Sequence, residues 1–237
     1  WRFLNNPFGK KVYVNYILSG NCLAAFYAVS PVKVTINGTE HKLALSNMTM
    51  THPEHQGKGY FKNLALDLYQ TLKSDGYSGV FGFANQNSHY GFRKNLGWID
   101  LAELNSFHAD QATLKVVAPG FNGSLRFKEE DINLNHIQLT ASMRCSDQPV
   151  LPLRSEPFLN WRLLNNPIHK YYSLLISNTN GILGIIFYKY FKGGIDIMEY
   201  FFKDSADFTR YDLLHHGISY FIQNYKCSVN IWSNLHS

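Results

Sequence analysis

The segment "MTMTHPEHQGKGYFKNLA" (residues 48–65) predicts a strand that passes through a proline turn directly into a helix. The strand is expected over residues 41–50. After the turn, apolar residues recur at the spacing of an amphipathic helix. Those helical positions are Phe61, Leu64, Ala65, Leu68, Tyr69 and Leu72. Between strand and helix lies Gln-Gly-Lys-Gly at 56–59, the glycine loop.

The glycine loop is typical of a turn that binds an anion. Gly57 and Gly59 carry no side chain, so the backbone there can approach a ligand closely. The free N–H groups of the first helical turn would point at that ligand, together with the positive end of the helix dipole. Lys58 and Lys62 add positive charge. A turn without any ligand is the alternative, since neither the Walker nor the Rossmann glycine pattern is present.

Beyond this segment, the chain repeats itself. Seven of ten positions are identical between "WRFLNNPFGK" (residues 1–10) and "WRLLNNPIHK" (residues 161–170). Each repeated segment precedes an alternating strand, a polar turn and a second apolar strand, and then a strand, a helix and a further strand. Two α/β domains in tandem are therefore predicted, over residues 1–118 and 119–237. The turn-rich stretch 118–124 is the expected join.

Composition fits a folded protein without membrane spans. Of 237 residues, 45% are hydrophobic, 15% aromatic and 16% charged, which is typical of a packed globular chain. The longest apolar runs are far shorter than the ~20 residues that cross a bilayer. The net charge of +5 is scattered, so it does not indicate nucleic-acid binding. The chain starts at Trp1 without a Met, so we expect residues upstream to be missing.

The cysteines indicate neither disulfides nor metal binding. Cys22, Cys145 and Cys227 are few and widely separated, which favours a reducing cytoplasm and small, packed side chains. His52 and His55 have the spacing of a ligand pair. No third ligand is near them in sequence, so no metal site is predicted.

Two ordered signatures in the first half resemble the GNAT acetyltransferase superfamily. The glycine loop matches the family's pyrophosphate-binding loop, although Phe61 stands where a small residue is usual. The second signature is an Asn before a short helix that ends in Gly-Phe, and "ANQNSHYGFRKNLGW" (residues 84–98) answers it. The resemblance covers residues 1–107 well. It implies two GNAT-like domains, each an α/β (α+β) fold with a mixed, mostly antiparallel sheet flanked by helices.

What the resemblance implies is direct acyl transfer from acetyl-CoA, the donor substrate, to a small amine or amino sugar. A backbone N–H near Met50 or Thr51 would stabilise the oxyanion, a contribution of about 3 to 4 kcal/mol. The residues expected to bind the donor are Thr49, Met50, Thr51, Gln56, Gly57, Lys58, Gly59, Tyr60, Phe61, Asn85, Asn87 and Arg93.

Proton transfer is where the chain departs from the family. The Tyr that commonly protonates the departing thiolate would fall at Arg93, which cannot donate a proton. Tyr90, one helical turn earlier, is the candidate substitute, and a packed aromatic is the alternative for it. His52 and His89 are the candidate bases, since a pKa of about 6.5 suits removal of a proton from an ammonium group.

The second half is expected to bind no CoA. Its corresponding stretch has no glycine between Gly194 and Gly217, and Asp204 and Asp207 are expected to cap the helix instead. Two other functions remain open: aminoacyl transfer from charged tRNA, as in the Fem ligases, and ligand binding without catalysis. The Fem ligases lack a clear glycine loop, which counts against the first.

Overall fold

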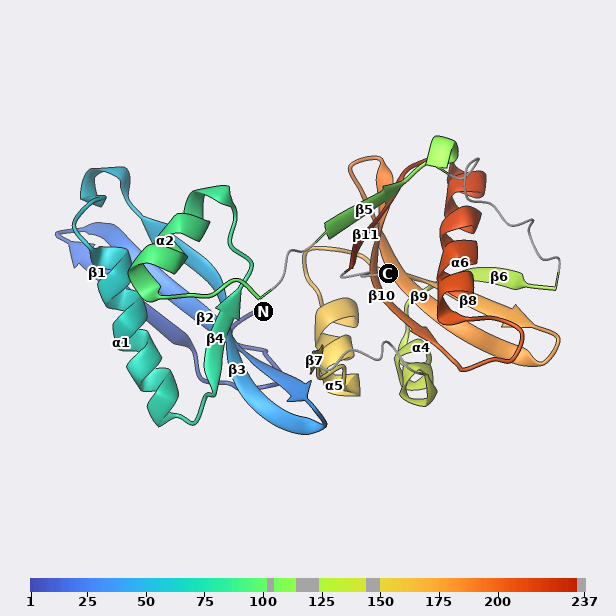
Figure 1. Ribbon diagram of the computed structural model, residues 1–237, viewed down its shortest axis with the longest axis horizontal. Coiled ribbons are helices and arrows are strands. Elements are labelled where there is room, and N and C mark those ends of the chain that lie inside the picture. The colour runs from blue at the N-terminus through green and yellow to red at the C-terminus, as the bar shows by residue number, and fades with distance from the viewer. Residues whose placement is uncertain (102–104, 114–123, 144–149, 234–237) are drawn as a thin grey trace. The chain divides into compact units, whose positions relative to one another are not determined.

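The computed structural model describes residues 1–101, 105–113, 124–143 and 150–233. The chain forms two compact units (Figure 1). The first comprises Trp1–Leu101 with Gln148–Arg154, and the second comprises Ala102–Asp147 with Ser155–Ser237. All of the predicted join except Ser124 lies outside the described residues, as does Cys145.

The first unit is built on one mixed sheet in the order β1-β2-β3-β4. β3 and β4 are parallel, and the other pairs are antiparallel. β2 is long enough to pair with β1 along its first half and with β7 near its end. The strands are β1 (Tyr13–Ser19), β2 (Cys22–Ile36), β3 (Thr39–Thr51), β4 (Gly79–Gly82) and β7 (Val150–Pro152).

Two helices and one short turn complete the first unit: η1 (Pro53–His55), α1 (Tyr60–Ser74) and α2 (Gln86–Leu96). α1 lies against the sheet because its apolar side chains share one face (Figure 1). Its buried residues are Leu64, Ala65, Leu68 and Leu72. A chain of hydrogen bonds adds specificity to this core. Trp98 Nε1 donates to Tyr69 Oη at 3.0 Å, and Tyr69 Oη lies 3.1 Å from Tyr27 Oη.

The second unit contains a sheet in the order β5-β11-β10-β9-β8-β6, in which β10 and β11 are the parallel pair. The strands are β5 (Asn105–Ala109), β6 (Arg126–Asp131), β8 (Tyr172–Asn178), β9 (Gly181–Phe191), β10 (Gly194–Phe202) and β11 (Val229–Ser233). The helices are α4 (Leu134–Leu139), η2 (Thr140–Ser142), α5 (Glu156–Leu159), η3 (Asn160–Leu164) and α6 (Arg210–Tyr225). α6 contacts four strands of this sheet and buries Leu213, Phe221 and Ile222 in its core.

The two units repeat one order of elements. β1-β2-β3-α1-β4 in the first corresponds to β8-β9-β10-α6-β11 in the second, and each series ends in a parallel pair. The predicted α/β fold with two mixed, mostly antiparallel sheets is therefore confirmed. The division at residue 118 would give β5 to the first domain, but β5 pairs with β11 of the second sheet. Pairing in space, rather than position along the chain, decides where this strand belongs.

The repeated segments share a turn at their second Asn, although residues 160–164 form a π-helix and the first copy has turns instead. Asn6 Oδ1 accepts the N–H of Phe8 at 2.9 Å, and Asn166 Oδ1 accepts the N–H of Ile168 at the same distance. In both copies the Asn side chain thus forms a turn across the following proline, which directs the chain toward its first strand. The side-chain NH₂ groups of these two Asn residues have different hydrogen-bond partners. Asn6 Nδ2 donates to Pro31 O, whereas Asn166 Nδ2 donates to Arg162 O and Tyr171 Oη.

Candidate functional site

The glycine loop has the backbone conformation that requires glycine. Gly57 has φ of 75° and Gly59 has φ of 76°, which is the left-handed region. A Cβ added at either position would meet no atom within 4 Å. The space beside the loop is therefore open, and backbone groups on both sides of Lys58 are accessible to a ligand.

The N-terminus of α1 is not capped by a side chain. Gly59 is its N-cap, and Asn63 N–H is the first to bond back along the helix, to Gly59 O at 3.1 Å. The N–H groups of Tyr60, Phe61 and Lys62 precede that bond and carry the positive end of the helix dipole. Such a helix start can bind an anion.

Next to the glycine loop, the paired strands β3 and β4 separate. Their pairing runs from Leu43–Gly79 to Ser46–Gly82, while β3 continues to Thr51 paired with β2 alone. A bulge at Asn47 bends β3 where the two strands part. The predicted donor-binding residues Thr49, Met50 and Thr51 all lie on this separated end. Backbone groups alternate in direction along an antiparallel strand, and His52 N–H donates to Ala24 O of β2. The backbone groups of Met50 therefore also face β2, and those of Thr49 and Thr51 face away from it.

Phe61 fills the space between α1 and α2. Its ring packs edge-on against Phe92, with centroids 5.2 Å apart, and against Tyr27 at 6.0 Å. A Cβ added at Gly91 would lie 3.6 Å from Phe61 Cε1, which is an ordinary contact distance. The large residue at this position thus packs against α2.

Asn85 and Asn87 lie at the start of α2 but have different roles. Asn85 is the N-cap, and its Oδ1 accepts the N–H groups of Asn87 and Ser88 at 3.1 and 3.0 Å. Among the described residues, none hydrogen bonds to the side-chain amide of Asn87. That amide is exposed and available to a ligand.

The predicted proton-transfer residues are only partly brought together. Tyr90 is 65% exposed on α2, and Lys94 Nζ donates to its hydroxyl at 2.5 Å. His89 Nε2 lies 2.8 Å from Asp100 Oδ1, and Arg93 pairs with the other oxygen at 3.0 Å. The hydrogen bond from His89, with help from Arg93, lowers the pKa of Asp100 below its usual value.

The remaining residues of the loop are exposed or half-buried. Lys58 Nζ lies 3.2 Å from His55 Nδ1, and the Tyr60 ring stacks on His55 at 6.2 Å. Gln56 N–H donates to Pro53 O, which closes the turn before Gly57. His52 N–H donates to Ala24 O at 2.9 Å, so this histidine continues the pairing of β3 with β2.

The second unit replaces the glycine loop with a capped helix. Thr209 is the N-cap of α6: its Oγ1 accepts Asp212 N–H at 3.1 Å, and Asp212 Oδ2 accepts Thr209 N–H at 2.8 Å. The expectation that Asp204 and Asp207 cap this helix is wrong. The helix begins later than predicted, and Asp204 instead pairs with Arg210.

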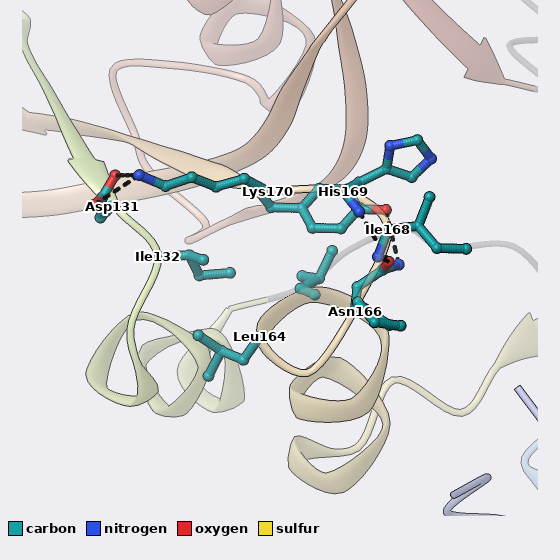
Figure 2. A pocket seen from close by; sticks show the side chains of 10 residues that line it. Asp131, Ile132, Leu164, Asn166, Ile168, His169 and Lys170 are labelled. Carbon is teal, nitrogen blue, oxygen red and sulfur yellow. Dashed lines mark hydrogen bonds and ion pairs between the residues drawn. The ribbon is translucent and has the colours of Figure 1, made fainter. Parts of the chain in front are cut away.

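A pocket of about 420 Å³ lies within the second unit, against the second repeated segment (Figure 2). Most of its polar side chains already have partners. Lys170 Nζ bonds to Asp131 at 3.0 Å, which raises the pKa of that lysine, and Asn166 Oδ1 is used by the turn described above. The His169 imidazole, which also lines the pocket, has no hydrogen-bond partner among the described residues.

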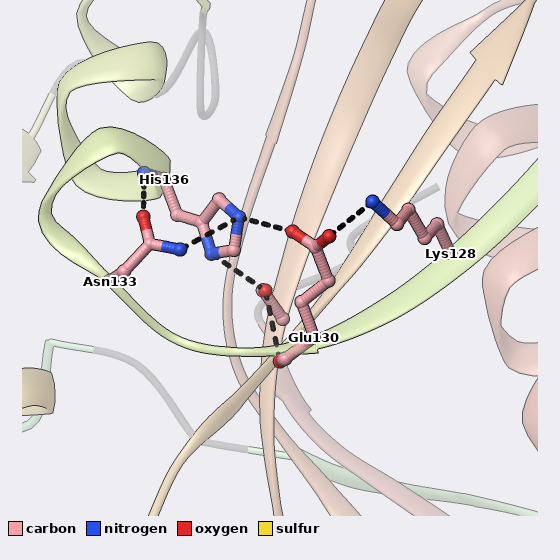
Figure 3. Close-up of polar contacts among 5 residues, drawn as sticks. Lys128, Glu130, Asn133 and His136 are labelled. Atoms are coloured by element: carbon pink, nitrogen blue, oxygen red, sulfur yellow. Dashed lines mark hydrogen bonds and ion pairs between the residues drawn. The ribbon is translucent and has the colours of Figure 1, made fainter.

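Sequence reasoning missed a buried polar network in the second unit. His136 lies between Asn133 and Glu130, with Nε2 2.8 Å from Glu130 Oε2 (Figure 3). Its Nδ1 lies 2.9 Å from Ser173 Oγ. The order Ser-His-Glu resembles a catalytic triad, but Ser173 is fully buried and cannot meet a substrate. The network ties β6, β8 and α4 together.

Sequence reasoning also missed Cys22, which lies beside His52 and His55. No local pattern links it to them, because it lies 30 positions before His52. Only the pairing of β2 with β3 reveals this proximity.

Comparison with known proteins agrees with this geometry. Residues 4–99 match the family model described as "Acetyltransferase (GNAT) domain". No curated protein matches this sequence. Among the described residues, no helix is both long and apolar enough to cross a membrane.

Solved structures share the fold at low sequence identity. A protein of Enterococcus faecalis V583, described as a "Probable N-Acyltransferase", has a TM-score of 0.67 and 13% identity over 95% of this chain and 56% of its own. A GCN5-related N-acetyltransferase of Kribbella flavida has a TM-score of 0.63 and 14% identity, over 95% of this chain and 54% of its own. Saccharomyces cerevisiae N-myristoyltransferase with bound myristoyl-CoA has a TM-score of 0.52 and 11% identity, over 89% of this chain and 60% of its own. The chain thus spans little more than half the length of the structures it resembles.

Proposed function

We propose that this chain, whose residues 4–99 form a GNAT acetyltransferase domain, is an acyl-CoA-dependent N-acetyltransferase. The donor is acetyl-CoA, and the acceptor is a small amine or amino sugar. One observation carries the proposal. Helix α1 starts without a side-chain cap, directly after two glycines with positive φ, and its start lies beside the point where β3 and β4 separate.

The donor would bind in two parts. Its pyrophosphate would accept hydrogen bonds from the backbone of the glycine loop and the first turn of α1, with Lys58 and Lys62 adding positive charge. Its pantetheine arm carries amides, which need backbone partners. The separated end of β3 offers them at Thr49 and Thr51, whose backbone groups face away from β2. The S. cerevisiae structure of this fold was solved with myristoyl-CoA, which supports an acyl-CoA as the donor class.

The reaction is a direct transfer. A neutral amine attacks the thioester carbonyl, a C–N bond forms, and the C–S bond breaks with release of CoA thiolate. His52 or His89 would take the proton from the amine, and Tyr90 would protonate the thiolate. A backbone N–H near Met50 or Thr51 would stabilise the oxyanion. No covalent enzyme intermediate is needed.

Two other functions fit the chain less well. A Fem-like aminoacyl transferase would not need the open glycine loop, whose two positive φ values serve close approach of an anion. A ligand-binding module without catalysis would need the loop but no acid or base. Turnover of acetyl-CoA with an amine acceptor separates this module from the enzyme.

Titration calorimetry with acetyl-CoA tests donor binding. Gly57→Val and Gly59→Val should each remove measurable binding, because a branched side chain blocks the loop backbone and is strained at positive φ. Gly38→Val is the matched control. Gly38 has φ of 80° and open space around it, but lies in the β2–β3 turn, so this variant should share the strain and keep full affinity.

Thermal unfolding of all three variants shows whether the strain costs are comparable. Full acetyl-CoA affinity in both loop variants, at a stability equal to that of Gly38→Val, would remove the basis of the proposal.

A further inference from the structure

We propose that Cys22, His52 and His55 form a binding site for a divalent transition-metal ion, with Zn²⁺ the ion that suits them best. Each residue offers one ligand atom, and the three atoms lie within 4.8 Å of one another. All three side chains are partly buried. The proposal does not depend on the acyltransferase activity; an ion bound at His52 would leave His89 as the base of the proposed transfer.

The sheet brings the cysteine to the histidines. β2 and β3 are antiparallel with Ala25 opposite Thr51, and the next contact along is His52 N–H to Ala24 O at 2.9 Å. Continuing the same register past that contact places Cys22 level with the turn that follows His52. The strand pairing therefore brings Cys22 to this turn.

The η1 turn brings the two histidines to one side. A 3₁₀ turn has three residues per turn, so positions 52 and 55 lie above one another. The two imidazole rings stand 5.8 Å apart between centroids and are steeply inclined, at 66°. His52 Nδ1 also accepts Glu54 N–H at 3.3 Å, which helps to orient its ring.

The donor set is that of zinc. One thiolate and two imidazoles are ligands that Zn²⁺ prefers over carboxylate and water, and bond lengths of ~2.0 to 2.3 Å place tetrahedral ligand atoms about 3.3 to 3.6 Å apart. The three atoms lie within 4.8 Å of one another, so they would have to approach by about 1 Å to reach that spacing, through small rotations of the side chains. Three protein ligands leave a fourth position for water or another ligand.

The surroundings are compatible with an ion. Each imidazole has two nitrogens, so one can bind the ion while the other keeps its present contact. Lys58 Nζ lies 3.2 Å from His55 Nδ1 and is the one cation in hydrogen-bond contact with these three side chains among the described residues. Lys58 is exposed, so its long side chain can turn toward water when an ion binds.

Titration of the reduced protein with Co²⁺ tests the site directly. Cobalt replaces zinc in such sites and gives a thiolate-to-metal charge-transfer band, which reports the sulfur ligand. We expect one Co²⁺ per chain with this band, and displacement of Co²⁺ by one equivalent of Zn²⁺.

Two ligand variants and one control complete the experiment. Cys22→Ser should abolish the band, and His55→Gln should weaken Co²⁺ binding more than about 10-fold. Cys227→Ser is the control, because Cys227 is also free and partly buried but lies in the second unit. It should leave both band and affinity unchanged.

The absence of a charge-transfer band in the unaltered protein would overturn the proposal, whatever the variants do. So would a band that persists in Cys22→Ser or disappears in Cys227→Ser, since the sulfur would then belong to another cysteine. Far-ultraviolet circular dichroism of each variant confirms that it is folded.

Discussion

Phe61 is the residue at which this chain departs from the acetyltransferase loop that it resembles. A bulky ring in the first turn of α1 would crowd most neighbours. Here it packs edge-on against Phe92 of α2. The bulky side chain is therefore held against α2, and the N–H groups of the helix start keep their open side.

Removal of the Tyr90 hydroxyl group tests whether Tyr90 is the acid. Tyr90→Phe should lower kcat by about 10² to 10⁴-fold, because it removes the proton donor while the ring remains. Acetyl-CoA affinity should not change, since the glycine loop is untouched. Steady-state kinetics and calorimetry measure the two quantities separately.

The control for that variant is Tyr211→Phe. Tyr211 is 67% exposed, close to the 65% of Tyr90, and lies on α6 of the second unit. It should have no effect on either quantity. If Tyr90→Phe turns over at the rate of the unaltered protein, another group protonates the thiolate.

Helices α1 and α6 occupy corresponding places in the two units but begin differently. α1 starts at a glycine without a side-chain cap, and α6 starts with a reciprocal pair of bonds between Thr209 and Asp212. A cap of this kind stabilises a helix by about 1 kcal/mol. α1 lacks that stabilisation and keeps its N–H groups for a ligand.

The packing of α2 and α6 predicts opposite effects for one substitution. Gly91→Ala should stabilise the protein by about 0.5 to 1 kcal/mol, because alanine favours a helix and its Cβ would make an ordinary 3.6 Å contact with Phe61. Gly217→Ala should destabilise it by about 1 kcal/mol net, because its Cβ would come within 2.4 Å of buried Ile186.

Urea unfolding followed by circular dichroism measures both changes. Each variant is the other's control, since the chemical change is identical and only the neighbours differ. Equal shifts of the same sign would show that helix propensity alone decides the outcome, and that the packing around Gly217 relaxes freely.

Although the chain contains two copies of one fold, we expect only one donor site per molecule. In the first unit the helix start is open, whereas in the second the Thr209–Asp212 pair occupies it and Asp212 puts a carboxylate where a pyrophosphate would sit. That pair lowers the pKa of Asp212, so the carboxylate stays charged at neutral pH. Calorimetric titration of the intact chain with CoA should give a stoichiometry near one.

Gly57→Val provides the control for that titration, because it should reduce the stoichiometry to zero. Asp212→Ala should leave it near one, since loss of the cap does not create the two left-handed glycines that the first unit has. A value near two in the unaltered chain would place a second donor site in a unit that we consider structural.

Local patterns in the sequence determined the elements of both units and the glycine loop. Leu64, Leu68 and Leu72 recur at the helical period, and two glycines before a helix predict an open start, because such properties depend on neighbouring residues alone. The resemblance of the first half to the GNAT acetyltransferases rests on the same kind of local pattern, and residues 4–99 match the GNAT domain model. Roles for Tyr90 and His52 remain predictions.

Tertiary structure alone decided what depends on residues distant along the chain. β5 joins the second sheet through β11, Phe61 packs against Phe92, and Cys22 meets His52 and His55 across β2 and β3. The N-cap of α6 could not be predicted from the sequence either, because several polar residues near its start could serve as the cap and Thr209 is the one that does. Strand register and packing bring such groups together, and no sequence pattern within one element contains that information.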